Sequence, residues 1–345
     1  MKKLFIILVI LFGSVVVLAE KVADLTELEK PHAIECDGEN FYIMDEATVH
    51  VYSMKDYKHV RRFGSRGDGP YQLVPGSEVP IQLSLLSNNI QLCSMYKMVT
   101  YSKIGKPIDE KVFHRRFLEL TPIKKNFAAV ELDVDPADRR VHIYSVQFIQ
   151  SGFEDRKKLI QFEIPPIGVK GRNGFGIPVF THINVANDNL YVFSQQHDNE
   201  IFVYNADGKE IKRIKVNLPR LKVTDSVKKG IFDYLIKSKL FKIYGLEERS
   251  LDKTVFFYEY LPSFRMFKMK GGIIYLQTYE QKGDNFRFVL MDLNGKILKT
   301  LYLPVEVYDL LQMGTHTTYC FDKNTYYYLV DNDEAETWEL HKVKF

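Results

Sequence analysis

Residues 37–43 read Asp37-Gly38-Glu39-Asn40-Phe41-Tyr42-Ile43, a tight polar turn that leads into a short β run. An apolar strand, a polar turn and a second strand occur in this order six times, with turns that begin at residues 37, 87, 138, 187, 271 and 323. The turns begin about 50 residues apart, except for one gap of roughly 80, and a period in this range is typical of propellers and repeat arrays. A single four-stranded blade cannot bury both of its faces, so such repeats pack side by side around an axis. The sequence therefore predicts an all-β, six-bladed β-propeller of four-stranded antiparallel blades.

The last blade has only three predicted strands, at about 317–321, 326–330 and 337–343, before the chain ends. An open blade would leave an unpaired sheet edge, which proteins avoid. Residues 20–29 are of strand length and belong to no other predicted blade. We therefore expect this segment to be the closing strand of the last blade. The third blade is expected to span 123–164, with its first hairpin turn at 138–141.

The N-terminus has the composition of a secretory signal peptide. Lys2 and Lys3 precede sixteen uncharged residues that end at Ala19, with small residues at the −3 and −1 positions. An uncleaved anchor is the alternative, although spanning a bilayer takes about 20 apolar residues. We expect residues 1–19 to be a signal peptide that is removed on export to the periplasm or the cell exterior, so that no membrane span remains.

Residues 20–345 are expected to form one propeller domain and a monomer, since a repeat array runs as a single unit. Loss of the two signal lysines leaves a formal charge of about +1. A nucleic-acid-binding surface needs an excess of basic residues, so we expect no nucleic-acid partner. The three cysteines, Cys36, Cys93 and Cys320, are too few for a disulfide framework and are expected to be unpaired and buried. Cys36 and Cys320 lie on innermost strands of blades that ring closure would make neighbours.

The links between predicted strands divide into two faces. Links on one face are short, whereas those on the opposite face are long, at 64–80, 165–181, 217–262 and 304–314. Rigid scaffolds carry function on their long loops, so the long-loop face is the predicted binding face. Its candidate binding residues are Arg66, Asp68, Tyr71, Gln196 and His197.

One long link, residues 220–262 between the fourth and fifth blades, is predicted to contain a helical insertion. Thr224 or Asp225 can cap a helix there. Val227, Ile231, Leu235 and Leu240 then form an apolar stripe at approximate helical spacing.

The link after the first blade reads Arg62-Phe63-Gly64-Ser65-Arg66-Gly67-Asp68-Gly69-Pro70-Tyr71-Gln72-Leu73. It resembles the Gly-x-x-Gly-x-Gly-Pro-Gly-x-Phe segment that connects blades in NHL-type propellers. In blade count and strand pattern the chain is similar to exported bacterial six-bladed β-propeller proteins. Tyr71 replaces the usual glycine of the motif, and the later blades lack the segment. The resemblance implies the fold but no single activity, because NHL-like propellers include binding modules and enzymes.

Aligning the blades on their central tyrosines places four residues at the starts of innermost strands, at the channel mouth on the long-loop face: His32, His182, Arg265 and His316. Such a ring could bind a metal, an anion or a carboxylate ligand. Protonation of its imidazoles near pH 6.5 would make it more positive at low pH. The alternative is that these are ordinary strand ends, which tolerate histidine.

Two functions of different classes fit this sequence. The first is an exported binding or scaffold module that presents its long-loop face and channel mouth to a glycan, peptide or protein. The second is a lactonase-like hydrolase or a lyase at the channel mouth, using a metal or the histidine ring. The chain contains no Gly-x-Ser-x-Gly elbow, no His-Glu-x-x-His and no P-loop. We therefore prefer the binding module and predict no cofactor and no dedicated metal site.

Overall fold

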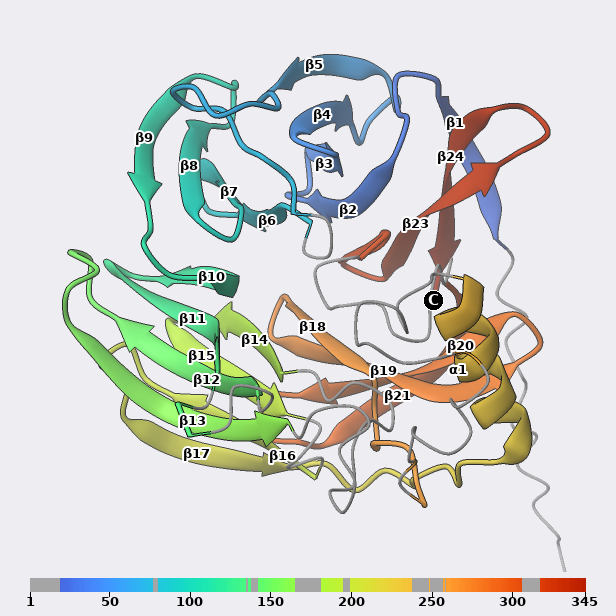
Figure 1. Ribbon diagram of the computed structural model, residues 1–345. Coiled ribbons are helices and arrows are strands. Elements are labelled where there is room, and N and C mark those ends of the chain that lie inside the picture. Colours follow the sequence, from blue (N-terminus) through green and yellow to red (C-terminus); the bar gives the residue numbers. More distant parts are fainter. Residues whose placement is uncertain are drawn as a thin grey trace, which may run out of the picture.

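The computed structural model describes residues 19–76, 80–134, 136–137, 142–164, 181–194, 199–237, 248, 257, 259–305 and 317–345. Their strands form six four-stranded antiparallel blades around a central axis (Figure 1). Within these ranges a single helix, α1 (Asp225–Lys237), occurs between the fourth and fifth blades. The predicted all-β propeller with one helical insertion is confirmed.

Each blade runs from its innermost to its outermost strand in chain order, except the last. Blade 1 consists of β2 (Pro31–Cys36), β3 (Asn40–Asp45), β4 (Thr48–Ser53) and β5 (His59–Phe63). Blade 2 consists of β6 (Gln82–Leu85), β7 (Asn89–Cys93), β8 (Lys97–Ser102) and β9 (Pro107–Val112). Blade 3 consists of β10 (Phe117–Ile123), β11 (Asn126–Val134), β12 (His142–Ile149) and β13 (Arg156–Ile164).

The second half of the ring repeats this order. Blade 4 consists of β14 (Thr181–Ala186), β15 (Asn189–Ser194), β16 (Glu200–Tyr204) and β17 (Glu210–Lys215). Blade 5 consists of β18 (Met266–Lys270), β19 (Ile273–Lys282), β20 (Asn285–Asp292) and β21 (Ile297–Pro304). Blade 6 consists of β22 (Tyr319–Asp322), β23 (Thr325–Asn332), β24 (Thr337–Lys344) and, outermost, β1 (Glu20–Leu25).

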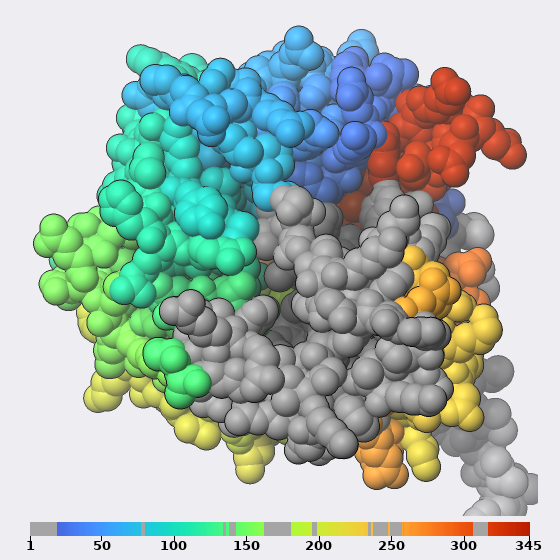
Figure 2. Space-filling model, in the orientation of Figure 1, coloured from blue at the N-terminus to red at the C-terminus, as the bar shows by residue number. Residues whose placement is uncertain are grey.

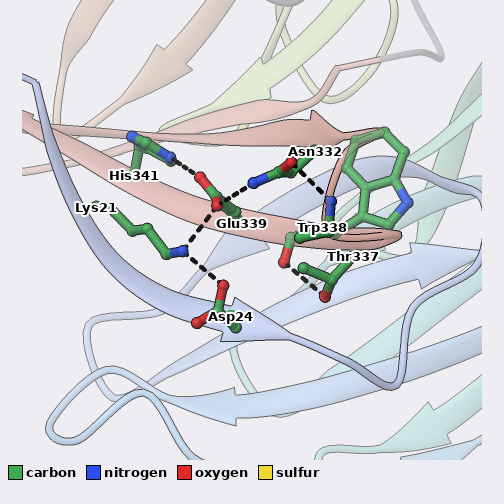
Figure 3. A network of polar contacts seen from close by, with 8 residues as sticks. Lys21, Asp24, Asn332, Thr337, Trp338, Glu339 and His341 are labelled. Carbon is green, nitrogen blue, oxygen red and sulfur yellow. Dashed lines mark hydrogen bonds and ion pairs between the residues drawn. The ribbon is translucent and has the colours of Figure 1, made fainter.

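The N-terminal strand closes blade 6, as the sequence predicted. β1 pairs with β24 in antiparallel register from Glu20 opposite Lys342 to Leu25 opposite Trp338. Figure 3 shows the polar network across this pairing, in which Lys21 of β1 points toward the carboxylate of Glu339. Lys21 Nζ lies 2.7 Å from Glu339 Oε1. The two chain ends thus hold the ring together.

The carboxylate of Glu339 is the centre of this network (Figure 3). Besides Lys21, Asn332 Nδ2 donates to its Oε1 at 2.8 Å, and a ring nitrogen of His341 lies 2.7 Å from its Oε2. Hydrogen bonds from Lys21, then Asn332 and His341, lower the pKa of Glu339 to about 2. The carboxylate is buried and therefore depends on these donors to remain charged.

Glycine turns between the third and fourth strands bring blades 4 and 5 close to the blade that precedes each of them. Gly208 (φ +68°) in blade 4 would bring an added Cβ to 2.9 Å from the Phe148 ring of blade 3. Gly295 (φ +86°) in blade 5 would likewise approach the Ile214 side chain of blade 4 to 2.8 Å. These turns need glycine both for the left-handed backbone and for the close approach between blades.

Blade 3 corrects one sequence-based prediction. The chain was expected to make its first hairpin turn there at residues 138–141, but β10 ends at Ile123 and β11 begins at Asn126. The turn is therefore Lys124-Lys125, with Lys124 in the left-handed region (φ 54°). Residues 138–141 themselves lie outside the described residues. The prediction was wrong because it relied on Asp, Asn and Gly as the residues that mark tight turns, whereas here Lys124 adopts the positive φ.

Two further predictions are confirmed within the described ranges. All three cysteines are free and buried. Thr224 caps α1, since its Oγ1 accepts the Val227 N–H at 3.4 Å and its carbonyl accepts the Lys228 N–H at 3.0 Å. Residues 1–18 of the predicted signal peptide and most of the insertion after α1 lie outside the described residues.

Candidate functional site

The channel mouth holds three of the four residues predicted to form a ring. His32 and His182 lie at the starts of β2 and β14, and Arg265 immediately precedes β18. All three are buried, with His182 and Arg265 each 4% exposed. His316 lies outside the described residues. These three side chains therefore have little contact with solvent, and their role as a binding ring stays a prediction.

The polar groups around the channel join neighbouring blades. Among the described residues, each of the six junctions carries at least one bond between innermost strands or their first residues. His32 Nε2 lies 2.9 Å from Ile81 O, Leu120 N donates to Gln82 Oε1 at 2.8 Å, Ile183 N donates to Glu119 Oε2 at 3.0 Å, Asn184 Nδ2 donates to Phe267 O at 3.2 Å, Lys268 Nζ donates to Tyr319 O at 2.9 Å, and Ile34 N donates to Thr317 O at 3.0 Å.

These hydrogen bonds between innermost strands have a physical cause in the propeller fold. The innermost strand of each blade has a free edge at the channel, where backbone N–H and C=O groups would otherwise be unpaired. Side chains from the preceding blade satisfy several of these groups, as Gln82 and Glu119 do for the next strand. Polar residues at these positions therefore have a structural role in joining neighbouring blades.

Burial also determines the charge of the mouth. Desolvation lowers the pKa of His182 to about 4 and raises the pKa of Glu119 to about 8, although the Ile183 N–H favours the Glu119 carboxylate. His182 Nδ1 and Glu119 Oε1 are 3.9 Å apart. Both groups are therefore uncharged at pH 7, and their contact is not an ion pair. Desolvation lowers the pKa of His32 as well, against the bond to Ile81.

The expected gain of positive charge at low pH does not occur at His182, because an imidazole with a pKa of about 4 stays neutral at pH 5.5. His32 also has a lowered pKa, and its Nε2 faces the Ile81 carbonyl. The electrostatics of these two imidazoles therefore do not favour binding of an anion by protonated histidines. Whether the mouth binds a ligand remains a prediction.

Sequence reasoning missed three polar residues at the mouth. Glu119 stands in the apolar run Phe117-Leu118-Glu119-Leu120, where an isolated acid is a detectable signal. Tyr319 donates its hydroxyl to Gln277 Oε1 at 2.9 Å, and burial raises the pKa of the Tyr319 phenol. Their pairing joins blades 5 and 6 and is invisible in the sequence, because the two residues belong to different repeats.

A second site lies on the long-loop face, over blade 2. A groove of about 310 Å³ opens between the 64–76 link and the turn that joins β7 to β8. Its walls include Asp68, Gln72, Val74, Met95, Tyr96 and Val112. Tyr96, at the tip of the turn, is 51% exposed. Blades 1 and 2 form the blue and blue-green part of the surface in Figure 2.

The link that forms one wall of the groove is held by its own hydrogen bonds. Leu73 N donates to Ser65 O at 3.1 Å, and Gly69 N donates to Gln72 Oε1 at 3.1 Å. Lys97 Nζ donates to Gly69 O at 2.8 Å. The side chain of Lys97 in β8 therefore attaches this wall of the groove to blade 2.

Tyr71 occupies the position where the NHL-type motif has glycine, and it adopts the left-handed backbone (φ 57°) that glycine favours. Its N–H donates to Glu110 Oε2, and its carbonyl accepts the Tyr101 hydroxyl at 2.6 Å. Both backbone groups are thus fixed while the side chain remains 40% exposed. Backbone strain of this kind, held in place by the surrounding structure, is characteristic of functional sites.

The other predicted binding residues are distributed unevenly. Asp68 lines the groove, and Tyr71 precedes the lining residue Gln72. Arg66 lies on the same link, with its guanidinium 3.7 Å from the Glu46 carboxylate. Gln196 and His197 lie outside the described residues. The structure therefore brings Asp68 to a groove that sequence reasoning did not identify.

Metal-ligating side chains do not gather in the part of the chain that the structure describes: no three His, Cys, Asp or Glu residues there are grouped so that they could hold a metal ion. None of the described helices is long and apolar enough to cross a membrane.

Comparison with known proteins supports the fold. No family model matches the sequence, and no curated protein matches it. A member of the DUF4221 family from Bacteroides vulgatus is similar in structure, with a TM-score of 0.51 and 12% identity over 95% of each chain. Luciferin-regenerating enzyme gives a TM-score of 0.49 with 11% identity over 95% of each chain. BamB from Moraxella catarrhalis gives 0.41 with 8% identity over 95% of this chain and 100% of its own.

Proposed function

We propose that this chain is an exported binding module, and that the groove over blade 2 receives an apolar or aromatic side chain of a protein partner. The observation that carries this proposal is the groove itself, with the half-exposed Tyr96 in its wall. Exposed tyrosines beside a preformed hollow are typical anchors of protein interfaces. Export rests on the signal-like residues 1–19.

The chemistry of the walls favours a peptide over a glycan. Val74, Met95 and Val112 offer apolar surface. Gln72 Oε1 already accepts the Gly69 N–H, and Lys97 Nζ lies 3.0 Å from Glu110 Oε2. Binding of a sugar needs several polar groups that can exchange hydrogen bonds with hydroxyls, and these two are already in use. The carboxylate of Asp68, which also lines the groove, would bind a polar or basic residue of the peptide next to its apolar anchor.

Tyr96→Ala tests the groove directly. Peptides that bind the full chain would be selected from a random displayed library, and a glycan array would be probed in parallel. We expect the selected peptides to share an aromatic or aliphatic anchor, and Tyr96→Ala to weaken their binding at least about tenfold, since an interface anchor contributes more than about 1.4 kcal/mol. Tyr260→Ala is the matched control, because Tyr260 is a 40% exposed tyrosine outside the groove. Peptides unaffected by Tyr96→Ala, or binding of glycans alone, would refute the assignment.

Tyr71 permits a second test that separates binding from stability. Tyr71→Gly removes the side chain and suits the left-handed backbone, whereas Tyr71→Ala removes the side chain and keeps the strain. We expect both variants to bind the selected peptides more weakly than the wild type, and by the same factor. In urea unfolding, Tyr71→Gly should be more stable than Tyr71→Ala by about 1 kcal/mol. If peptide affinity is retained in both variants, Tyr71 takes no part in binding.

The alternative function is a hydrolase at the channel mouth. The observation in its favour is Glu119, which keeps its proton at pH 7 next to His182 and could act as a general acid. Assays with chromogenic lactones and aryl esters would test this alternative. Activity lost in Glu119→Gln and kept in Tyr96→Ala would support the hydrolase over the binding module.

A further inference from the structure

Two cysteine thiols meet at the junction where the ring closes. Cys36 is the last residue of β2 in blade 1, and Cys320 lies in β22 of blade 6. Both are free, fully buried and part of one hydrophobic cluster. The Cys36 thiol donates to the carbonyl of Phe321, the residue after Cys320, at 3.4 Å, and its interaction with the Cys320 thiol contributes to raising the pKa of Cys320.

The strand register explains why these thiols meet. Ala33 forms a parallel bridge with Thr317, and Ile34 N donates to Thr317 O at 3.0 Å. Each cysteine lies three residues beyond its bridging residue, and the Cys36 thiol reaches the carbonyl of Phe321, the residue after Cys320, at 3.4 Å. The two cysteines are therefore neighbours across the junction, and a disulfide between them needs their Cα atoms to lie about 4.4–6.8 Å apart.

The third cysteine does not share this arrangement. Cys93 ends β7 in blade 2, and its thiol donates to the carbonyl of Ser94 at 3.2 Å. It belongs to a different hydrophobic cluster. Cys93 therefore serves as an internal control for any chemistry of the other two.

We propose that Cys36 and Cys320 are an oxidisable pair whose disulfide locks blade 1 to blade 6. The bond would join residues near the two ends of the chain and would add a covalent link to a junction otherwise held by hydrogen bonds and packing. A cross-link that closes a long loop restricts the unfolded chain strongly, so it stabilises the closed ring.

The reaction needs a disulfide-class oxidant, such as oxidised glutathione. One cysteine thiolate attacks a sulfur of the oxidant and releases a glutathione thiolate, and the second cysteine thiolate then attacks the mixed disulfide and releases the other. The cysteines together lose two protons and two electrons, while the oxidant becomes two thiols. Burial, with the interaction with Cys36, raises the pKa of the Cys320 thiol, so this thiol is protonated and unreactive in the folded protein. The bond therefore forms while the junction is open, before or during ring closure.

Thiol counting on the full chain tests the pair. The protein would be unfolded in urea, refolded in a buffer of oxidised and reduced glutathione, and denatured again to count free thiols. We expect one free thiol in the wild type, none in Cys93→Ser and two in Cys36→Ser, if the serine variant carries no glutathione. Peptide mapping without reductant should join the peptides that contain Cys36 and Cys320. Three free thiols in refolded wild-type protein, or a cross-link that contains Cys93, would overturn the proposal.

A second measurement tests whether the disulfide stabilises the ring, by comparing oxidised and reduced wild-type protein. The oxidised wild type should stay folded at urea concentrations that unfold the same protein after reduction. Cys36→Ser should unfold at the same urea concentration in both buffers. An oxidised protein that carries the Cys36–Cys320 bond but unfolds with the reduced form would show that the bond does not stabilise the ring.

Discussion

Deletion of residues 20–29 is expected to abolish cooperative folding of the propeller. The deletion removes β1 and leaves β24 with an exposed edge. It also removes the buried Leu25 and Leu28, and the carbonyl of Glu29 that accepts the Trp338 indole N–H at 3.2 Å. Blades 1 and 6 would then face each other across an unfilled space.

The expected loss approaches the whole stability of a folded domain. Burying a leucine side chain contributes about 1.5–3 kcal/mol. Removal of Lys21 also takes away the ammonium group that hydrogen-bonds the buried Glu339 carboxylate. Typical domains are stable by only about 5–15 kcal/mol. The deletion variant is therefore expected to show no cooperative transition in urea and to bind a dye that reports exposed apolar surface.

Point variants keep this prediction testable if the deletion variant cannot be purified. Leu25→Ala is expected to lower the free energy of unfolding by about 2–5 kcal/mol, because Leu25 is fully buried between blades 6 and 1. Leu298→Ala is the matched control, since this leucine of β21 is 51% exposed and should change stability by less than about 0.5 kcal/mol. A deletion variant that unfolds at the same urea concentration and with the same steepness as the parent would contradict closure by β1.

Glu119→Gln is expected to remove a large pH dependence of stability. The pKa of Glu119 is raised to about 8 in the folded protein, above its ordinary value of about 4.5. Below pH 4.5 both folded and unfolded chains carry the proton. As the pH rises from 4.5 to 8 the unfolded chain loses this proton and the folded chain keeps it, so stability falls. The raised pKa corresponds to a loss of about 3–5 kcal/mol by pH 8.

A glutamine at this position cannot ionise, and its amide oxygen can still accept the Ile183 N–H. The stability of Glu119→Gln relative to the wild type should therefore increase by the same few kcal/mol between pH 4.5 and pH 8, measured by urea unfolding at each pH. Comparing the two proteins cancels the opposite contribution of His182, whose lowered pKa reduces stability as the pH falls from 6.5 toward 4. Glu154→Gln, at an exposed glutamate, should follow the wild type at every pH. Parallel curves for the wild type and Glu119→Gln would mean that Glu119 is ionised in the folded protein.

The candidate sites were predictable only in part. The positions of His32, His182 and Arg265 at the starts of inner strands follow from the repeat alignment. Their burial does not, because it depends on the neighbouring blades. Asp68 and Tyr71 were identified through the motif that carries them. The groove beside them requires the turn at Tyr96, which belongs to another blade and carries no motif.

The sequence by itself determined the number of blades, the capped helix and the closure of the ring by β1. These features follow from short-range signals, namely strand alternation, turn residues and a missing strand, which act within one repeat. Only the tertiary structure decided the neutrality of Glu119 and His182 and the formation of the groove. Each of these depends on groups brought together from separate blades, and burial and contact between such groups arise only once the blades have packed around the axis.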